Sequence, residues 1–71
     1  MLNLYTTENC MICIVVLKAV QAIADSNNLQ LSVHGEDKDI PAYPALLYGQ
    51  TLLIGEGIPN ELTKILEGSK S

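Results

Sequence analysis

The residues best suited to chemistry are two cysteines, Cys10 and Cys13, which stand three positions apart in a chain of 71 residues. They are the only two cysteines in the sequence. Two thiols at this spacing can close on each other as a disulfide or can ligate the same metal ion. The CxxC spacing therefore predicts dithiol–disulfide chemistry or metal binding, and inert cysteines are the third reading.

The elements expected around the cysteines favour redox chemistry. Leu2 and Leu4 alternate with Asn3 and Tyr5 as in a half-buried strand, and polar residues 6–9 are typical of a turn. A helix is expected from residue 10, because polar residues recur there at three- and four-residue steps. The polar, solvent-facing side of this helix would consist of Lys18, Gln21, Asp25 and Asn28.

The position of each cysteine on this helix predicts its role. In the first turn, Cys10 would face unpaired backbone N–H groups and the positive end of the helix dipole, which favour a thiolate. Cys10 is therefore the candidate nucleophile. Cys13 would lie one turn deeper on the same face, within reach of the first sulfur, and is the candidate resolving thiol.

The rest of the chain reads as alternating strands and helices without an internal repeat or linker, so residues 1–71 are expected to form a single domain. The helix from residue 10 is the weakest prediction, because its many β-branched residues would also suit a strand. The length of the segment favours a helix. Gly49-Gln50 suits a two-residue hairpin loop, and a strand–helix–strand start implies a parallel crossover. The expected elements are strand 2–6, helix 10–27, strand 29–34, loop 35–43, strand 44–48, strand 51–55 and helix 59–67.

Composition narrows the class of protein. A net charge of −4 argues against nucleic-acid or anionic-membrane partners. The mostly apolar run 11–24 is not expected to be a signal peptide, because no lysine or arginine precedes it. It is also shorter than the ~20 residues of a membrane-spanning helix. A disulfide across three residues would stabilise a secreted mini-protein only weakly, so the pair is expected to be functional in a reducing cytoplasm.

Two segments resemble the thioredoxin superfamily, in particular the small glutaredoxin-like redoxins that reduce ribonucleotide reductase. Residues 5–13, Tyr-Thr-Thr-Glu-Asn-Cys-Met-Ile-Cys, resemble the family's strand–turn–CxxC opening. Residues 43–47, Tyr-Pro-Ala-Leu-Leu, with the following hairpin and Gly57, are similar to its Val-Pro-x-hydrophobic segment and glycine-rich exit. The resemblance implies a minimal thioredoxin-like α/β fold of order β-α-β-β-β-α, with a four-stranded mixed sheet and two helices.

The same resemblance assigns roles around the proline. It implies that Pro44 is a cis-proline opposite the CxxC and that the backbone of Tyr43 pairs with a bound peptide or thiol adduct. Without the resemblance, Pro44 would be an ordinary proline at the start of a strand, because most X–Pro bonds are trans, and Pro41 competes with it for the family's role.

The chain departs from the family in one large respect. Residues 35–43 replace the usual middle helix, and nine residues with Gly35 and Pro41 can form one helical turn at most. One sheet face is therefore expected to be open or covered by a partner. Met11, Ile14 and Leu17 could then form an association surface, for a homodimer or a larger protein, or could simply complete a thin core.

The predicted function is a small dithiol–disulfide oxidoreductase, an electron donor to protein disulfides that works without a cofactor. Cys10 and Cys13 form its redox-active disulfide, and Tyr43 and Pro44, with residues Met11 and Ile12 between the cysteines, bind the substrate. The expected target is a disulfide-containing protein such as a ribonucleotide reductase.

The residues near the CxxC also bear on the electron donor. Family members that bind glutathione use basic and polar side chains, and only Lys38 is expected nearby, so a thioredoxin reductase-like flavoenzyme is the preferred donor. Glu8 places a carboxylate beside Cys10, which makes the thiol less acidic and the pair a stronger reductant.

Two other classes of function stay open. The CxxC supplies two metal ligands, so zinc or a [2Fe–2S] cluster would need a symmetric dimer or external thiols, and His34 could add a ligand. A lone histidine at a strand end is more often a solvated surface residue. The third class is a redox-silent docking module that keeps the fold without turning over.

Overall fold

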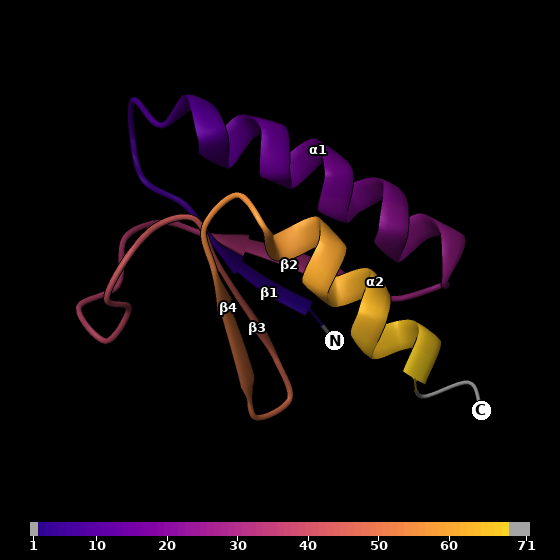
Figure 1. Cartoon of the computed structure of the whole chain (residues 1–71). Coiled ribbons are helices and arrows are strands. Elements are labelled where there is room, and N and C mark those ends of the chain that lie inside the picture. Colours follow the sequence, from indigo (N-terminus) through magenta and orange to yellow (C-terminus); the bar gives the residue numbers. More distant parts are fainter. Residues whose placement is uncertain (1, 69–71) are drawn as a thin grey trace.

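The computed structural model describes residues 2–68. The chain has the expected order of strands and helices, and each element lies within two residues of its predicted bounds (Figure 1). The elements are β1 (Leu2–Tyr5), α1 (Met11–Ser26), β2 (Leu31–His34), β3 (Ala45–Tyr48), β4 (Thr51–Ile54) and α2 (Ile58–Gly68).

The four strands form one mixed sheet in the order β2-β1-β3-β4. Strands β1 and β2 are parallel, and β3 is antiparallel to both of its neighbours. The β3–β4 connection is the predicted two-residue hairpin loop, in which Gly49 takes a left-handed φ of 62°. The parallel crossover and the antiparallel hairpin expected from the sequence are both confirmed.

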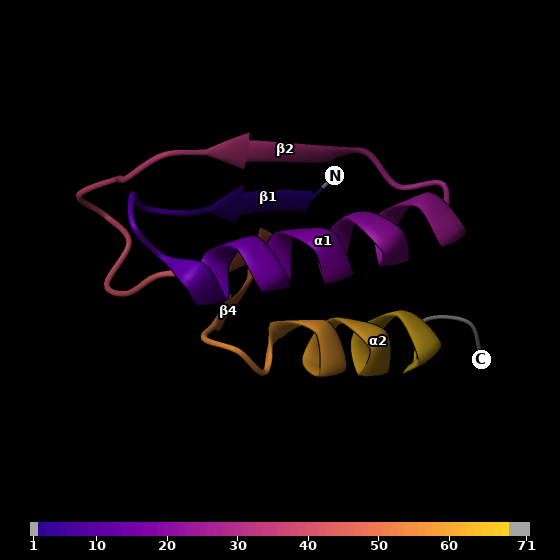
Figure 2. The same cartoon turned by 90° about the horizontal axis from the view of Figure 1, so that it is seen from above.

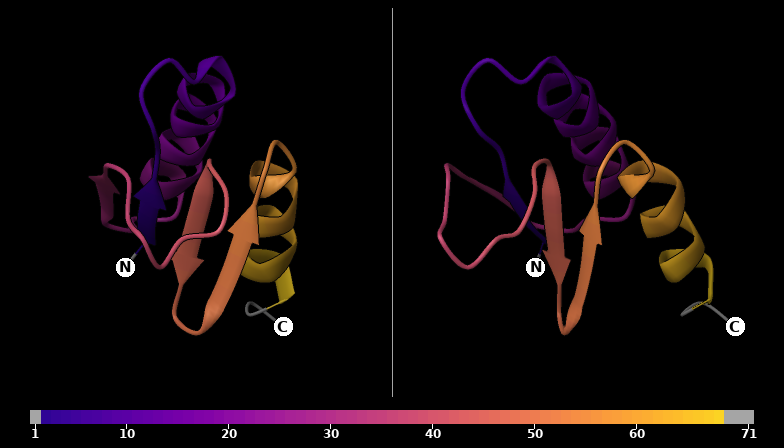
Figure 3. Two further views of the ribbon diagram at one scale, coloured as in Figure 1. Left: turned by 90° about the vertical axis from the view of Figure 1, so that its left-hand side faces the viewer. Right: turned by 60° about the vertical axis from the view of Figure 1, so that its left-hand side comes forward.

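Both helices cover the same face of the sheet, as Figures 2 and 3 show from above and from the side. The two-residue period of β1 sends Leu2 and Leu4 into this layer and Asn3 and Tyr5 to the other face. Aliphatic side chains dominate the core, and burying each large one contributes roughly 1.5–3 kcal/mol. The core consists of Leu2, Leu4, Val16, Val20, Ala24, Leu46, Ile58, Leu62 and Leu66.

The opposite face of the sheet has no helix within residues 2–68. Residues 35–43 form a loop, as predicted, and β4 leaves Leu52 39% and Ile54 45% exposed on this face. The Tyr43 hydroxyl ties the loop together, since it donates to Asp37 O at 2.7 Å and accepts from Asp37 N at 2.6 Å. The result is a minimal thioredoxin-like α/β arrangement.

A left-handed residue, Asn28, follows the end of helix α1. Asn27 donates its backbone N–H to Ile23 and Ala24, Asn28 has a φ of 55°, and the N–H of Leu29 reaches Ala24 O at 2.8 Å. These bonds satisfy carbonyl groups that the last helical turn leaves unpaired. Within residues 2–68, neither helix has the length and apolar character needed to cross a membrane.

Candidate functional site

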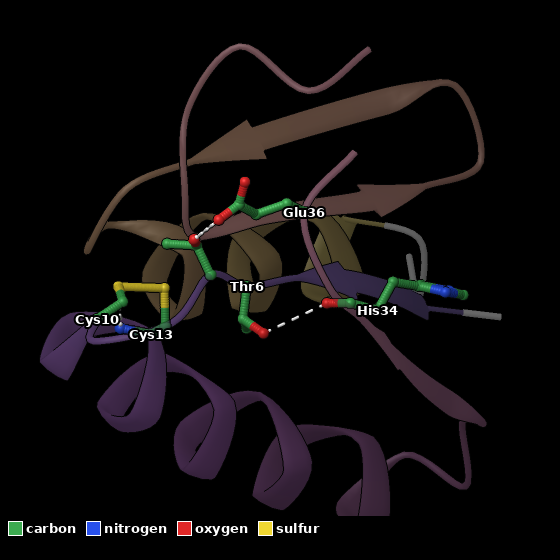
Figure 4. Close-up of a disulfide and its surroundings, with 6 residues drawn as sticks. Thr6, Cys10, Cys13, His34 and Glu36 are labelled. Atoms are coloured by element: carbon green, nitrogen blue, oxygen red, sulfur yellow. Dashed lines mark hydrogen bonds between the residues drawn. A yellow bond between two sulfur atoms is a disulfide. The ribbon is translucent and has the colours of Figure 1, made fainter. Parts of the chain in front are cut away.

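Cys10 and Cys13 form a disulfide at the amino end of α1, with 5.2 Å between their Cα atoms (Figure 4). The helix begins one residue later than predicted, so Cys10 is its N-cap and not part of its first turn. Its extended backbone (φ −108°, ψ 101°) lets the Cys10 sulfur accept the Cys13 backbone N–H at 3.1 Å. The sulfur thereby takes the place of the oxygen that commonly caps a helix.

The turn between β1 and α1 positions Cys10. Thr6 extends the β1–β2 ladder by donating its N–H to His34 O at 3.0 Å, and its hydroxyl reaches the same oxygen. The Thr7 hydroxyl donates to Glu36 across the two loops. Asn9 then turns the chain with a φ of 58°, a left-handed conformation that asparagine tolerates better than most residues.

The two sulfurs have different access to solvent. Cys13 is 2% exposed, whereas Cys10 is only half-buried. The first turn of α1 has no acidic residue, so backbone N–H groups and the helix dipole favour negative charge at the Cys10 sulfur when the bond is open, whereas the Glu8 carboxylate two residues before Cys10 opposes it. Cys10 is therefore able to attack a sulfur of another molecule, whereas Cys13 can attack only the sulfur of Cys10.

A groove of about 480 Å³ lies against the disulfide. Polar groups from the turn line one part of it, and apolar side chains of α1 line the rest. Its lining residues are Thr6, Thr7, Asn9, Cys10, Met11, Cys13, Ile14 and Leu17. A segment of another molecule that enters this groove would meet the Cys10 sulfur, since Cys13 is buried.

The Tyr43–Pro44 peptide bond is cis, whereas the bond before Pro41 is not. Pro44 is buried, and its carbonyl accepts the Gly55 N–H at 2.9 Å. Because Ala45 pairs with Tyr5, Pro44 lies at the end of the sheet where β1 leaves toward the cysteines. The hydrogen bonds of Tyr43 within residues 2–68 come from its hydroxyl, so its backbone N–H and C=O are unpaired there.

The other residues singled out from the sequence divide into exposed and packed ones. Met11 and Ile12 are 79% and 48% exposed, and Ile14 is 55% exposed. Leu17 instead packs against the core, so it contributes less to any association surface than expected. Val15, at 66% exposed, was not singled out, although its position four residues after Met11 places it on the same side of the helix.

His34 lies on the open sheet face and not beside the sulfurs. Its ring stacks on Tyr5 with 4.9 Å between centroids, and its Nε2 pairs with Asn3 Oδ1 at 3.0 Å. Figure 4 shows the side chain extending away from the disulfide. Within residues 2–68, no three His, Cys, Asp or Glu side chains are grouped to hold a metal ion.

No family model, curated protein or solved structure matches this chain. A CxxC disulfide at the start of a helix, in a small α/β fold with a mixed four-stranded sheet, is compatible with a thioredoxin-like protein and consistent with redox chemistry.

Proposed function

We propose that this chain is a small thiol–disulfide oxidoreductase of the thioredoxin superfamily, similar to the glutaredoxin-like redoxins, which reduces protein disulfides in the cytoplasm. The observation that carries the proposal is the pairing of an accessible sulfur with a buried one at a helix amino terminus. This arrangement favours a thiolate at Cys10 and limits Cys13 to intramolecular attack.

The reaction is a two-electron exchange. The Cys10 thiolate attacks a sulfur of the target disulfide, which forms a mixed disulfide and releases the first target thiolate. Cys13 loses its proton to solvent and attacks the Cys10 sulfur, which closes the Cys10–Cys13 disulfide and releases the second target thiolate. The target gains two electrons and the chain loses two, and proximity of the thiols drives the second step.

The substrate would lie between the α1 amino terminus and the start of β3. The unpaired backbone of Tyr43, beside the buried Pro44, offers hydrogen bonds to an extended segment. Met11 and Ile12 offer apolar contact from the other side. The target in this proposal is a disulfide-containing protein such as a ribonucleotide reductase.

The oxidised chain must be reduced again by an external donor. Lys38 is the one lysine of the loop 35–43, and it lines none of the four grooves described on the surface. Glutathione carries two carboxylates and would gain little there. A thioredoxin reductase-like flavoenzyme is the electron donor in our proposal.

The test is the thiol–disulfide equilibrium of Cys10 and Cys13 in graded dithiothreitol and glutathione buffers, measured by alkylation and mass spectrometry. We expect a reversible two-electron transition near or below the potential of thioredoxin, about −270 mV. Insulin reduction by the wild-type chain, and its loss in Cys10→Ser, would support the proposal. Failure to form the disulfide at any potential would overturn it and leave metal binding in a dimer or a docking module.

A further inference from the structure

Two smaller grooves flank the groove at the disulfide. One, of about 240 Å³, shares Met11 with it and is lined by Met11, Ile12, Val15, Val16, Glu56 and Pro59. The other, of about 370 Å³, shares Thr6 and Thr7 with it and is lined by Thr6, Thr7, Glu8, Gly35 and Glu36. The three grooves therefore adjoin one another, and we call the surface that they form beside the disulfide the disulfide surface.

The disulfide surface is acidic at both ends. Glu56 lines one flanking groove, Glu8 and Glu36 line the other, and no lysine among residues 2–68 lines any of the three. None of these carboxylates is in an ion pair within residues 2–68, where the Lys64–Glu61 pair lies on α2. Glu36 only accepts a hydrogen bond from Thr7, which leaves its charge in place.

The middle of the same surface is apolar. Met11, Ile12, Ile14 and Val15 are between 48% and 79% exposed, and all lie in the first turns of α1. Exposed apolar residues that adjoin one another and have a polar rim are typical of a binding surface. The disulfide thus lies between the apolar strip of α1 and the polar turn, and carboxylates line the grooves on both sides.

From this distribution of charge we infer that the disulfide surface binds an extended, cationic segment of the target protein. The target cysteine is next to large apolar side chains and has lysine or arginine on both sides. This inference rests on the proposed function, whose substrate class it narrows. Opposite charges at the rim of a surface chiefly raise the association rate, and salt screens them.

The test uses the Cys13→Ser variant and matched peptides whose single cysteine forms a mixed disulfide with thionitrobenzoate. The Cys10 thiolate attacks the peptide sulfur and releases thionitrobenzoate, whose absorbance reports the rate. We compare an apolar peptide with flanking lysines, the same peptide with flanking glutamates, and a lysine peptide without apolar residues. At low salt we expect the first to react about tenfold faster than the second, with most of the difference lost in 0.5 M salt.

Charge-neutralising variants of the Cys13→Ser protein show which carboxylates cause the difference in rate between the lysine and glutamate peptides. Glu56→Gln and Glu36→Gln should each reduce the lysine-to-glutamate rate ratio about two- to threefold, as for exposed charge pairs. Glu67→Gln, on the last turns of α2 and outside the three grooves, is the matched control and should leave the ratio unchanged. Equal rates for the lysine and glutamate peptides would overturn the inference while leaving the oxidoreductase function standing.

A second measurement tests peptide binding without any reaction at Cys10. Peptides with serine in place of cysteine are titrated into the oxidised wild-type protein and followed by NMR chemical shifts. Shifts at residues 8–15 with the cationic apolar peptide alone would support the docking surface even if Cys10 proved unreactive. Absence of shifts together with equal reaction rates would reject it.

Discussion

At the scale of single residues, the two cysteines differ most in their access to solvent. Cys13 is buried in the first turn of α1, and Cys10 is the N-cap of the same helix. The chemical difference between two identical side chains therefore comes from their position on one helix. This difference can be measured without a natural substrate.

We predict that the two thiols alkylate at different rates in the reduced protein. Cys10 in the Cys13→Ser variant should react with iodoacetamide at least about tenfold faster than Cys13 in Cys10→Ser, because burial excludes the reagent and the helix amino terminus favours the Cys10 thiolate. Mass spectrometry over a time course measures both rates. Equal rates would contradict the assignment of nucleophile and resolving thiol.

Asn9 and Asn28 form a second informative pair, since both have left-handed backbone conformations and flank α1. Replacing either with alanine should lower the free energy of unfolding by about 1 kcal/mol, and replacing either with glycine should cost little. Only Asn9→Ala should also raise the reduction potential, by about 10–30 mV, because Asn9 sets the turn that presents Cys10. Urea unfolding and redox titration measure the two effects, and an equal change of potential in Asn28→Ala would refute a local role for Asn9.

At the scale of elements, α1 combines a packed face with an unusually apolar exposed face. Val16 is 1% exposed and belongs to the core, whereas its neighbour Val15 is 66% exposed. Packing of the first face accounts for a helix despite many β-branched residues, whose helix propensity is low. The apolar outer face lies outside the core and is exposed in the monomer.

These neighbours predict opposite results for the same substitution. Val16→Ala should lower the free energy of unfolding by about 2 kcal/mol through a lost core contact and a cavity. Val15→Ala should raise the free energy of unfolding slightly, by less than about 0.5 kcal/mol, because alanine is the better helix former. Far-UV circular dichroism in urea measures both, and a large loss in Val15→Ala would mean that this side chain is covered in solution.

At the scale of the whole molecule, a chain of 71 residues supports one thin layer of core between the sheet and two helices. The far face of the sheet, which no helix within residues 2–68 covers, keeps Leu52 and Ile54 exposed. A small core leaves little net stability after the loss of chain entropy.

We therefore expect a free energy of unfolding of about 3–5 kcal/mol for the monomer. Since the chain has no tryptophan, urea unfolding is best followed by circular dichroism, at several protein concentrations. A midpoint that rises with concentration would show that association contributes stability. A concentration-independent value above about 8 kcal/mol would contradict the thin-core argument.

The sequence by itself determined the features that depend on near neighbours along the chain. Alternation in residues 2–5, the cysteine spacing and the Gly49-Gln50 loop predicted the elements, their order and the place of Cys10 at a helix start. Strand and helix periods, turn residues and caps act over a few residues, so they can be read directly from the sequence.

Only the tertiary structure decided which distant residues meet. It placed Glu56 and Met11 in the lining of one groove, joined Thr7 to Glu36 by a hydrogen bond, and stacked His34 on Tyr5. It also showed that Val15 is exposed while Leu17 packs inward. These contacts depend on the path of the whole chain and on competition for one core, which local sequence patterns do not encode.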